Sequence, residues 1–213
     1  MIPKHLFTTW IHDDFQSPYT AAHEAMFSKC LQSWQLLMPD YRITVIRRDD
    51  LLPRSDPWLH ARMAEGNFIG ASQWARLQYL YEVGGIYVDM DVEAVKSFDS
   101  LLNQQTFFGI QKDNFINNAI MGSVPGHPFF EKQMAYIKTC NPQDPQFGNE
   151  TGPRMVTRLL REYSDSERAQ YGIAIYPSEV FYPYHWTEKF TPACIRPETL
   201  AVHHWASSWC HVL

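Results

Sequence analysis

The stretch Gly84-Gly85-Ile86-Tyr87-Val88-Asp89-Met90-Asp91 contains the strongest structural signal in the chain. The two glycines end a predicted helix, and an apolar strand predicted over residues 86–90 follows them. Alternate residues of a strand point to opposite sides, so Tyr87, Asp89 and Asp91 share one side. The apolar side chains between them face the other side, which we expect to be the core.

The two acids at the end of this strand indicate a site for a divalent cation. Two carboxylates held side by side repel each other, and a cation between them removes that repulsion. Oxygen ligands suit Mg²⁺ or Mn²⁺, and such ions usually keep substrate phosphates as further ligands. A DxD pair can instead form a turn or cap a helix, but the Gly-Gly stop and the strongly apolar strand favour a metal site.

Two classes of enzyme use an apolar strand that ends in DxD. In phosphatases that form an aspartyl-phosphate, the first acid is the nucleophile. Those enzymes need a further acidic motif, and neither GDxxxD nor DD follows residue 91. In glycosyltransferases that use nucleotide sugars, the acids hold a metal ion on the diphosphate. This second class fits the chain better.

The composition of the chain limits its size class and its partners. With 213 residues and a formal net charge of −5 at pH 7, we expect one domain over residues 1–213 and no nucleic-acid partner. No apolar run is long enough to span a bilayer, and the first residues lack the pattern of a signal peptide. Four scattered cysteines without a CxxC pair suit a reducing compartment, so we expect a cytoplasmic protein.

Predicted strands alternate with predicted helices. The strands are expected over residues 5–11, 41–46, 86–90, 106–110, 116–122, 173–176 and 200–205. The helices are expected over residues 20–38, 57–65, 71–83, 128–139 and 153–163. Ser72 is expected to cap the third of these helices. This order predicts an α/β fold with a largely parallel sheet flanked by helices, whose ligands sit at the carboxyl ends of the strands.

The segment Ser72-Gln73-Trp74-Ala75-Arg76, followed by Leu80 and the stretch from Gly84 to Asp91, resembles the SDxxRxxxLxxxGGxYxDxD block of one group of enzymes. These are the DxD sugar-binding enzymes of glycosyltransferase family 32, which include capsular polysaccharide enzymes and yeast-type α-1,6-mannosyltransferases. The glucosylating clostridial toxins share the block. Further matches lie at residues 2–11, 118–128, 151–153 and 203–209. The resemblance covers nearly the whole chain and implies a GT-A (Rossmann-like) fold.

The resemblance also implies an activity. A metal-dependent enzyme of this kind moves a sugar from a UDP- or GDP-sugar with retention of the anomeric configuration, using Mn²⁺ or Mg²⁺. The acceptor would be a hydroxyl group of a glycan, a lipid-linked glycan or a protein, and we expect a role in bacterial surface polysaccharide synthesis. A lipid-linked acceptor would bring the protein into peripheral contact with the inner face of a membrane.

The resemblance to the family motif implies roles for individual residues of this chain. The donor-binding residues that the resemblance implies are Trp10, Ser72, Gln73, Arg76, Tyr87, Asp89, Ser207 and Trp209. The catalytic residues that it implies are Arg76, Asp89 and Asp91. The metal ligands that it implies are Asp91 and His204. Within this set, Trp10 would stack on the nucleotide base, although a tryptophan at a strand end can equally belong to the core.

The choice between two adjacent histidines rests on the closing segment of the chain. Strand alternation puts His203 and His204 on opposite sides, so only one of them is expected to reach the metal. We choose His204, because it precedes Ser207 and Trp209 at the spacing that the family's closing loop shows. A structural histidine pair between aromatic residues is the alternative.

One residue departs from the family pattern. Gln73 stands where the family usually has Asp. An aspartate there would accept hydrogen bonds from sugar hydroxyls and orient Arg76, whereas glutamine is neutral and can also donate. The departure leaves open a second hypothesis, in which the protein binds a nucleotide sugar or a glycan at a degenerate site and transfers nothing.

Overall fold

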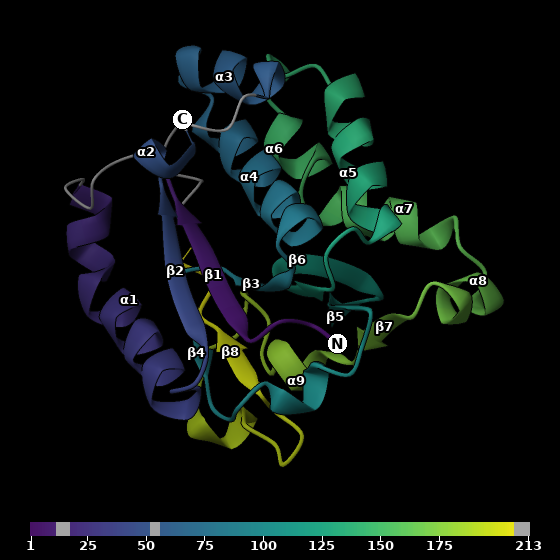
Figure 1. Cartoon of the computed structure of the whole chain (residues 1–213). Coiled ribbons are helices and arrows are strands. Elements are labelled where there is room, and N and C mark those ends of the chain that lie inside the picture. The colour runs from purple at the N-terminus through teal and green to yellow at the C-terminus, as the bar shows by residue number, and fades with distance from the viewer. Residues whose placement is uncertain (12–17, 52–55, 207–213) are drawn as a thin grey trace.

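The computed structural model describes residues 1–11, 18–51 and 56–206. In this part of the chain, six strands form a central sheet in the order β2-β1-β3-β6-β5-β7 (Figure 1). They are β1 (His5–Trp10), β2 (Arg42–Arg47), β3 (Gly85–Val88), β5 (Thr106–Lys112), β6 (Phe115–Ser123) and β7 (Ile173–Tyr176). β6 runs antiparallel to both of its neighbours, and the other five strands share one direction. The predicted α/β fold with a mostly parallel sheet is confirmed.

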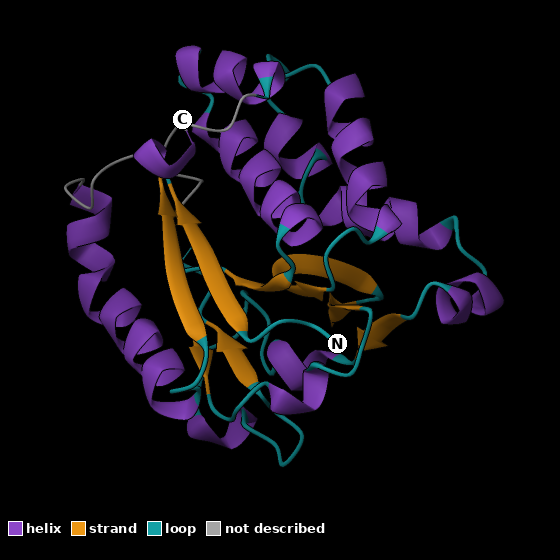
Figure 2. Cartoon of the chain, viewed as in Figure 1, coloured by secondary structure: helices purple, strands orange, loops and turns teal. Residues whose placement is uncertain are grey.

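Helices cover both faces of this sheet (Figure 2). α1 (Pro18–Leu37) packs on one face, and α4 (Phe68–Glu82), α5 (Pro128–Thr139) and α7 (Pro153–Arg161) pack on the other. The shorter helices are α2 (Arg48–Leu51), α3 (Pro57–Ala64), α6 (Phe147–Glu150), α8 (Asp165–Gln170), α9 (Ser178–Phe181) and the 3₁₀ turns η1 (Asp99–Leu101) and η2 (Pro192–Cys194). Among the described residues, no helix combines the length and the apolar character needed to cross a bilayer.

The two faces of β3 supply two separate cores. Ile86 and Val88 are fully buried and pack with the residues of α1, whereas Tyr87 packs with the residues of α4 and α5. This alternation is what the apolar pattern of the strand predicts. The end of β3 therefore lies between two packed layers, and these layers position the residues that follow the strand.

β3 is shorter than the sequence predicts. The strand ends at Val88, and the chain then makes a turn in which the Val92 amide donates to the Asp89 carbonyl over 3.1 Å. A small antiparallel ribbon follows, in which β4 (Val92–Ala94) pairs with β8 (Ala201–His203). The acidic pair therefore lies on the turn between β3 and this ribbon. The sequence pattern did not predict the ribbon, because its two strands lie more than a hundred residues apart.

The helix before the glycines also differs from expectation. α4 begins at Phe68, and its N-terminal cap is Asn67, whose side-chain oxygen accepts the Gly70 amide over 2.8 Å. Our assignment of Ser72 as the cap was wrong. Ser72 lies in the second turn of the helix, where its hydroxyl is 2.7 Å from the Thr9 hydroxyl of β1. The longer helix puts one side of its second turn against the carboxyl end of the sheet.

The Gly-Gly pair has a steric role. Gly84 and Gly85 adopt φ angles of +70° and +113°, which side chains rarely allow. A Cβ atom on Gly85 would lie 2.4 Å from the His5 carbonyl oxygen, and one on Gly84 would lie 2.9 Å from the Ser123 carbonyl oxygen. The chain thus passes from α4 into β3 through a gap that only glycine fits.

A matched pair of substitutions tests this constraint. Gly126 has a φ of +73°, close to that of Gly84, but a Cβ atom there meets nothing within 4 Å. We expect Gly126→Ala to lower the free energy of unfolding by about 1–2 kcal/mol through backbone strain alone. Gly84→Ala should cost about 1–3 kcal/mol more through steric overlap. Urea denaturation of both variants measures the difference, and equal losses would show that the gap is not tight.

Candidate active site

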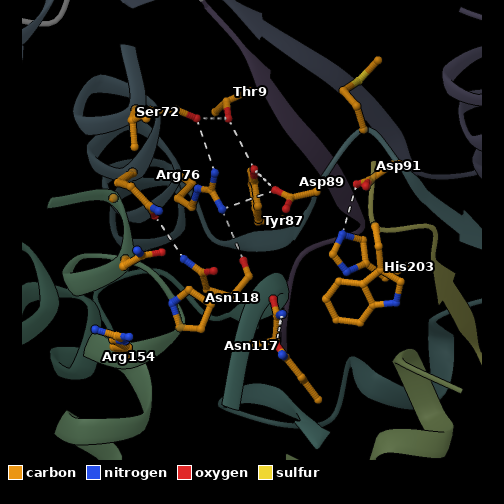
Figure 3. Close-up of a pocket in the computed structure, with 18 of the residues that line it drawn as sticks. Thr9, Ser72, Arg76, Tyr87, Asp89, Asp91, Asn117, Asn118, Arg154 and His203 are labelled. Atoms are coloured by element: carbon orange, nitrogen blue, oxygen red, sulfur yellow. Dashed lines mark hydrogen bonds and ion pairs between the residues drawn. The ribbon is translucent and has the colours of Figure 1, made fainter. Parts of the chain in front are cut away.

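A cavity of about 650 Å³ opens at the carboxyl ends of β1 and β3. Its walls come from the second turn of α4, the hairpin of β5 and β6, the N-terminal end of α7 and the residues around β8 (Figure 3). The predicted site residues that line it are Trp10, Ser72, Gln73, Arg76, Tyr87, Asp89 and Asp91. Two other predicted residues, Ser207 and Trp209, lie outside the residues that the structure describes.

Asp89 is held by two neighbours. The Tyr87 hydroxyl donates to its Oδ1 over 2.5 Å, and Arg76 Nη1 lies 3.3 Å from the same oxygen. The Arg76 guanidinium also lies over the Tyr87 ring, 4.4 Å from its centroid. Tyr87 and Asp89 share one side of the chain, as strand alternation predicts, and the strand geometry accounts for their contact.

Arg76 is a fixed, buried cation. Its side chain is only 10% exposed. Besides Asp89, the guanidinium donates to the Asn118 carbonyl from Nη1 and to the Ser72 hydroxyl from Nη2, each over 3.4 Å. The Ser72 hydroxyl is in turn held by Thr9. These contacts fix the positive charge beside the acidic pair before any ligand arrives.

Asp91 is buried on the other side of the site. Its Oδ1 lies 3.2 Å from Nε2 of His203, and its Oδ2 accepts the Ala206 amide over 2.7 Å. Its backbone carbonyl accepts the His204 amide over 2.9 Å. The segment that follows β8 is therefore attached to Asp91 through both side-chain and main-chain contacts.

The structure favours the histidine that we did not choose. His203, which pairs with Val92 across the β4–β8 ribbon, is the histidine that reaches Asp91. The ring of His204 points the other way, where its Nε2 lies 2.9 Å from Glu93 Oε2. That carboxylate also accepts a hydrogen bond from Lys29 over 2.7 Å. The register of a ribbon between distant segments decides which histidine faces the site, and the spacing to the closing loop does not reveal it.

The residues around Asp91 fit a divalent cation. Asp89, Asp91 and His203 each offer one ligand atom, and these atoms all lie within 4.8 Å of one another. Nδ1 of His203 is buried and has no hydrogen-bond partner among the described residues. Two carboxylates and one imidazole form a donor set that suits Mn²⁺, and Mg²⁺ somewhat less. The cofactor identity stays a prediction, but the donors for a cation are in place.

The electrostatics of the site separate the two acids. Burial raises the pKa of the Asp89 carboxyl, and the charge of Arg76 opposes that rise. Burial also acts on Asp91, but the charge and hydrogen bond of His203 outweigh it and hold the pKa of Asp91 below its usual value. Burial disfavours the charged form of His203, yet the nearby Asp91 carboxylate raises the pKa of this imidazole. Asp91 therefore keeps its negative charge to lower pH than Asp89 does.

Two other predicted donor-binding residues have partners within the protein. Trp10 lines the cavity but is only 3% exposed, and its ring packs edge-on against Phe27 with a centroid separation of 5.1 Å. Stacking of Trp10 on a base stays a prediction. The Gln73 side-chain oxygen accepts a hydrogen bond from Asn118 Nδ2 over 3.0 Å, so this pair forms part of the cavity wall.

Sequence reasoning assigned no role to several polar residues of the cavity. Gln111, Asn117 and Asn118 come from the hairpin of β5 and β6, and Arg154 comes from the N-terminal end of α7. β6 runs against its neighbours, so its beginning lies at the edge where the parallel strands end. The Asn-Asn pair at the start of the predicted strand over 116–122 was a usable signal, but only with the strand direction known.

Comparisons with known proteins agree with this geometry. Residues 24–108 match the family model of the glycosyltransferase sugar-binding region containing a DXD motif. The chain is 27% identical over 172 residues to mannosyl phosphorylinositol ceramide synthase CSH1 of Saccharomyces cerevisiae, covering 76% of this chain and 43% of that protein. It is 30% identical over 134 residues to human alpha-1,4-N-acetylglucosaminyltransferase, covering 59% and 37%. It thus spans less than half the length of these relatives.

The fold has a counterpart among solved structures. The PaToxG glycosyltransferase superposes with a TM-score of 0.59 at 17% sequence identity, covering 92% of this chain and 85% of that one. At this identity the likeness shows a shared GT-A-type fold. The matched family region ends at Phe108 and contains the acidic pair. The match at residues 24–108 supports the resemblance noted above at the level of the DXD sugar-binding region, and family 32 stays a prediction.

The two histidines provide a test of the metal site. We expect His203→Ala to weaken Mn²⁺ binding by about 100-fold, because it removes one of three donors. His204→Ala is the matched control, since it changes the adjacent ring, which points to Glu93, and it should alter the affinity less than about threefold. Isothermal titration with Mn²⁺ measures both. Stronger loss in His204→Ala would restore our original assignment.

Proposed function

We propose that the protein is a metal-dependent, retaining glycosyltransferase that takes its sugar from a nucleotide-diphosphate donor. The observation that carries this proposal is the meeting of Asp89, Asp91 and His203 within 4.8 Å at the floor of a cavity. The match of residues 24–108 to a DXD sugar-binding region supports the same reading of that site. The activity of the relatives is carried over to this chain as part of the proposal.

The charges of the cavity explain why a cation is needed. Two of its charged side chains are the acids Asp89 and Asp91, and Arg76 is already paired with the first of them. Arg154 is paired with Glu150 at 2.9 Å. A diphosphate adds further negative charge, which these paired cations cannot neutralise. Asp91, His203 and Asp89 would hold the ion, and when bound it would stabilise negative charge on the departing diphosphate.

The side chains of the protein have separate tasks in this scheme. Arg76, fixed at the cavity floor, points N–H groups towards the phosphate oxygens of the nucleotide sugar. The Gln73–Asn118 amide pair lies along the wall and offers hydrogen bonds to hydroxyl groups of the donor sugar. The acceptor oxygen bonds to the anomeric carbon and gives its proton to the departing diphosphate. The bond from that carbon to the diphosphate oxygen breaks, and its electron pair leaves with the diphosphate.

The finer assignments rest on resemblance. The names of the two relatives refer to mannosyl and to N-acetylglucosaminyl transfer, so both GDP- and UDP-sugars are candidate donors. We propose a place in glycosyltransferase family 32 and in bacterial surface polysaccharide synthesis, with the enzyme in the cytoplasm. A lipid-linked acceptor would add peripheral contact with the membrane.

A thermal-shift screen of UDP- and GDP-sugars with Mn²⁺ or with EDTA tests donor binding. A ligand of the folded state raises the melting temperature by mass action. We expect a shift with one nucleotide class, in the presence of Mn²⁺ only. A shift that EDTA leaves unchanged would contradict the metal site. Binding without later release of nucleotide would support the non-transferring protein that the Gln73 departure suggested.

Substitution of Asp91 tests whether its carboxylate is needed for the metal-dependent reaction. Asp91→Asn keeps the size of the side chain but removes its charge, so we expect it to lower Mn²⁺-dependent nucleotide release by about 100-fold or more. Asp99→Asn is the control, because Asp99 is also a hydrogen-bonded acid but pairs with Lys4 and Tyr41 outside the cavity. Nucleotide release from the donor measures both. Wild-type turnover in Asp91→Asn would refute the assignment.

A further inference from the structure

One aromatic side chain of the cavity stays open to solvent. Trp186 is 63% exposed, although it is a large apolar residue, and it lines the same cavity as the acidic pair. The residues of the floor are mostly buried: as whole residues, Arg76 is 9% and Asp91 is 7% exposed. Trp186 therefore stands at the mouth of the cavity, above the residues that would hold the diphosphate.

The loop that carries Trp186 is held in place by local hydrogen bonds. The His185 amide donates to Glu188 Oε2 over 2.8 Å, and its ring Nδ1 lies 2.8 Å from the Thr187 hydroxyl. The His185 ring packs beside the Trp186 ring, with a centroid separation of 5.2 Å. The exposed ring is thus braced by its neighbour, and little ordering is needed before a ligand can bind to it.

A second contact joins this loop to the acidic site. The Trp205 indole donates to the Tyr184 carbonyl over 3.1 Å, and its ring lies 4.2 Å from the ring of His203. The loop with Trp186 is therefore attached on the His203 side of the acidic pair. Thr9 and Ser72, next to the end of β1 that carries Trp10, lie on the other side (Figure 3).

The geometry points to an acceptor site: we infer that Trp186 stacks on a sugar ring of a neutral glycan that accepts the transferred sugar. This inference rests on the proposed function. When the diphosphate of the nucleotide sugar lies at the floor, the mouth of the cavity stays available to the acceptor. A sugar ring has an apolar face of C–H groups and a rim of hydroxyl groups. An indole can pack on the apolar face. The amides of Gln111 and Asn117 in the same cavity can hydrogen-bond to the hydroxyl groups.

The charges of the cavity favour a neutral acceptor over an anionic lipid headgroup. Among the described residues that line it, the basic side chains Arg76 and Arg154 each already pair with a carboxylate. A phosphorylated headgroup would add negative charge to a cavity that already has to hold two acids and the diphosphate of the nucleotide sugar. A neutral sugar needs only the hydrogen bonds and the ring face that the cavity offers.

The test separates acceptor use from donor chemistry. The donor with the largest Mn²⁺-dependent thermal shift is used, and its hydrolysis to free nucleotide is measured without an acceptor. Transfer is then measured with free lactose, maltose and mannobiose, and with phosphatidylinositol vesicles. The variants are Trp186→Ala, Trp186→Phe and the control Tyr171→Ala, which removes another exposed aromatic ring outside the cavity.

We expect at least one free sugar to accelerate nucleotide release. Trp186→Ala should raise the KM for that sugar about tenfold, as loss of a central aromatic contact does. Trp186→Phe should raise it less than about threefold, because a ring face remains. Donor hydrolysis and the donor KM should stay within about twofold of wild type in all variants, since Trp186 stands away from the diphosphate site.

Each other outcome overturns a defined part of the account. An unchanged acceptor KM in Trp186→Ala, or a raised donor KM, would remove the ring from an acceptor site. Acceleration by phosphatidylinositol vesicles alone would replace the neutral glycan with an anionic lipid, and no acceleration by any acceptor would refute the glycan acceptor. Absence of donor hydrolysis and transfer in the wild type would instead refute the proposed function itself.

Discussion

The repulsion between two neighbouring carboxylates, one buried and one half-buried, is the constraint on which the site depends. Asp89 and Asp91 follow the end of a buried strand, and each has its own partner: Arg76 beside the first and His203 beside the second. These partners come from segments far apart in the sequence. The fold therefore has to bring a helix and a C-terminal strand to the same edge of the sheet. The contacts of Arg76 and His203 with the two carboxylates stabilise that arrangement.

The remaining architecture serves this arrangement. Gly84 and Gly85 let the chain enter β3 between its neighbours without steric overlap. On the opposite face, the Trp34 indole of α1 donates to the Val92 carbonyl over 2.8 Å and so holds the β4–β8 ribbon. The ribbon sets the register that turns His203 inwards. Two dense cores thus position a polar site that neither layer could hold alone.

Local signals predicted much of this fold, and long-range pairing accounts for what they missed. Helix α5 and strand β7 have the predicted bounds, because proline, glycine and apolar periodicity define them within a few residues. The common side of Tyr87 and Asp89 followed from alternation alone. Alternation also placed His203 and His204 on opposite sides, but only the pairing of β8 with β4 decides which of them faces inwards. The cap at Asn67 was missed because an apolar turn separates it from the helix that the periodicity indicated.

The most direct test of the account is pulsed electron paramagnetic resonance of Mn²⁺ bound to the protein together with a nucleoside diphosphate. Asp89, Asp91 and His203 would hold one ion next to the diphosphate. We therefore expect ¹⁴N coupling from an imidazole and ³¹P coupling from the phosphates in the same spectrum, with the ¹⁴N coupling lost in His203→Ala. A spectrum with ³¹P coupling but no ¹⁴N coupling, or one unchanged by that substitution, would contradict this assignment.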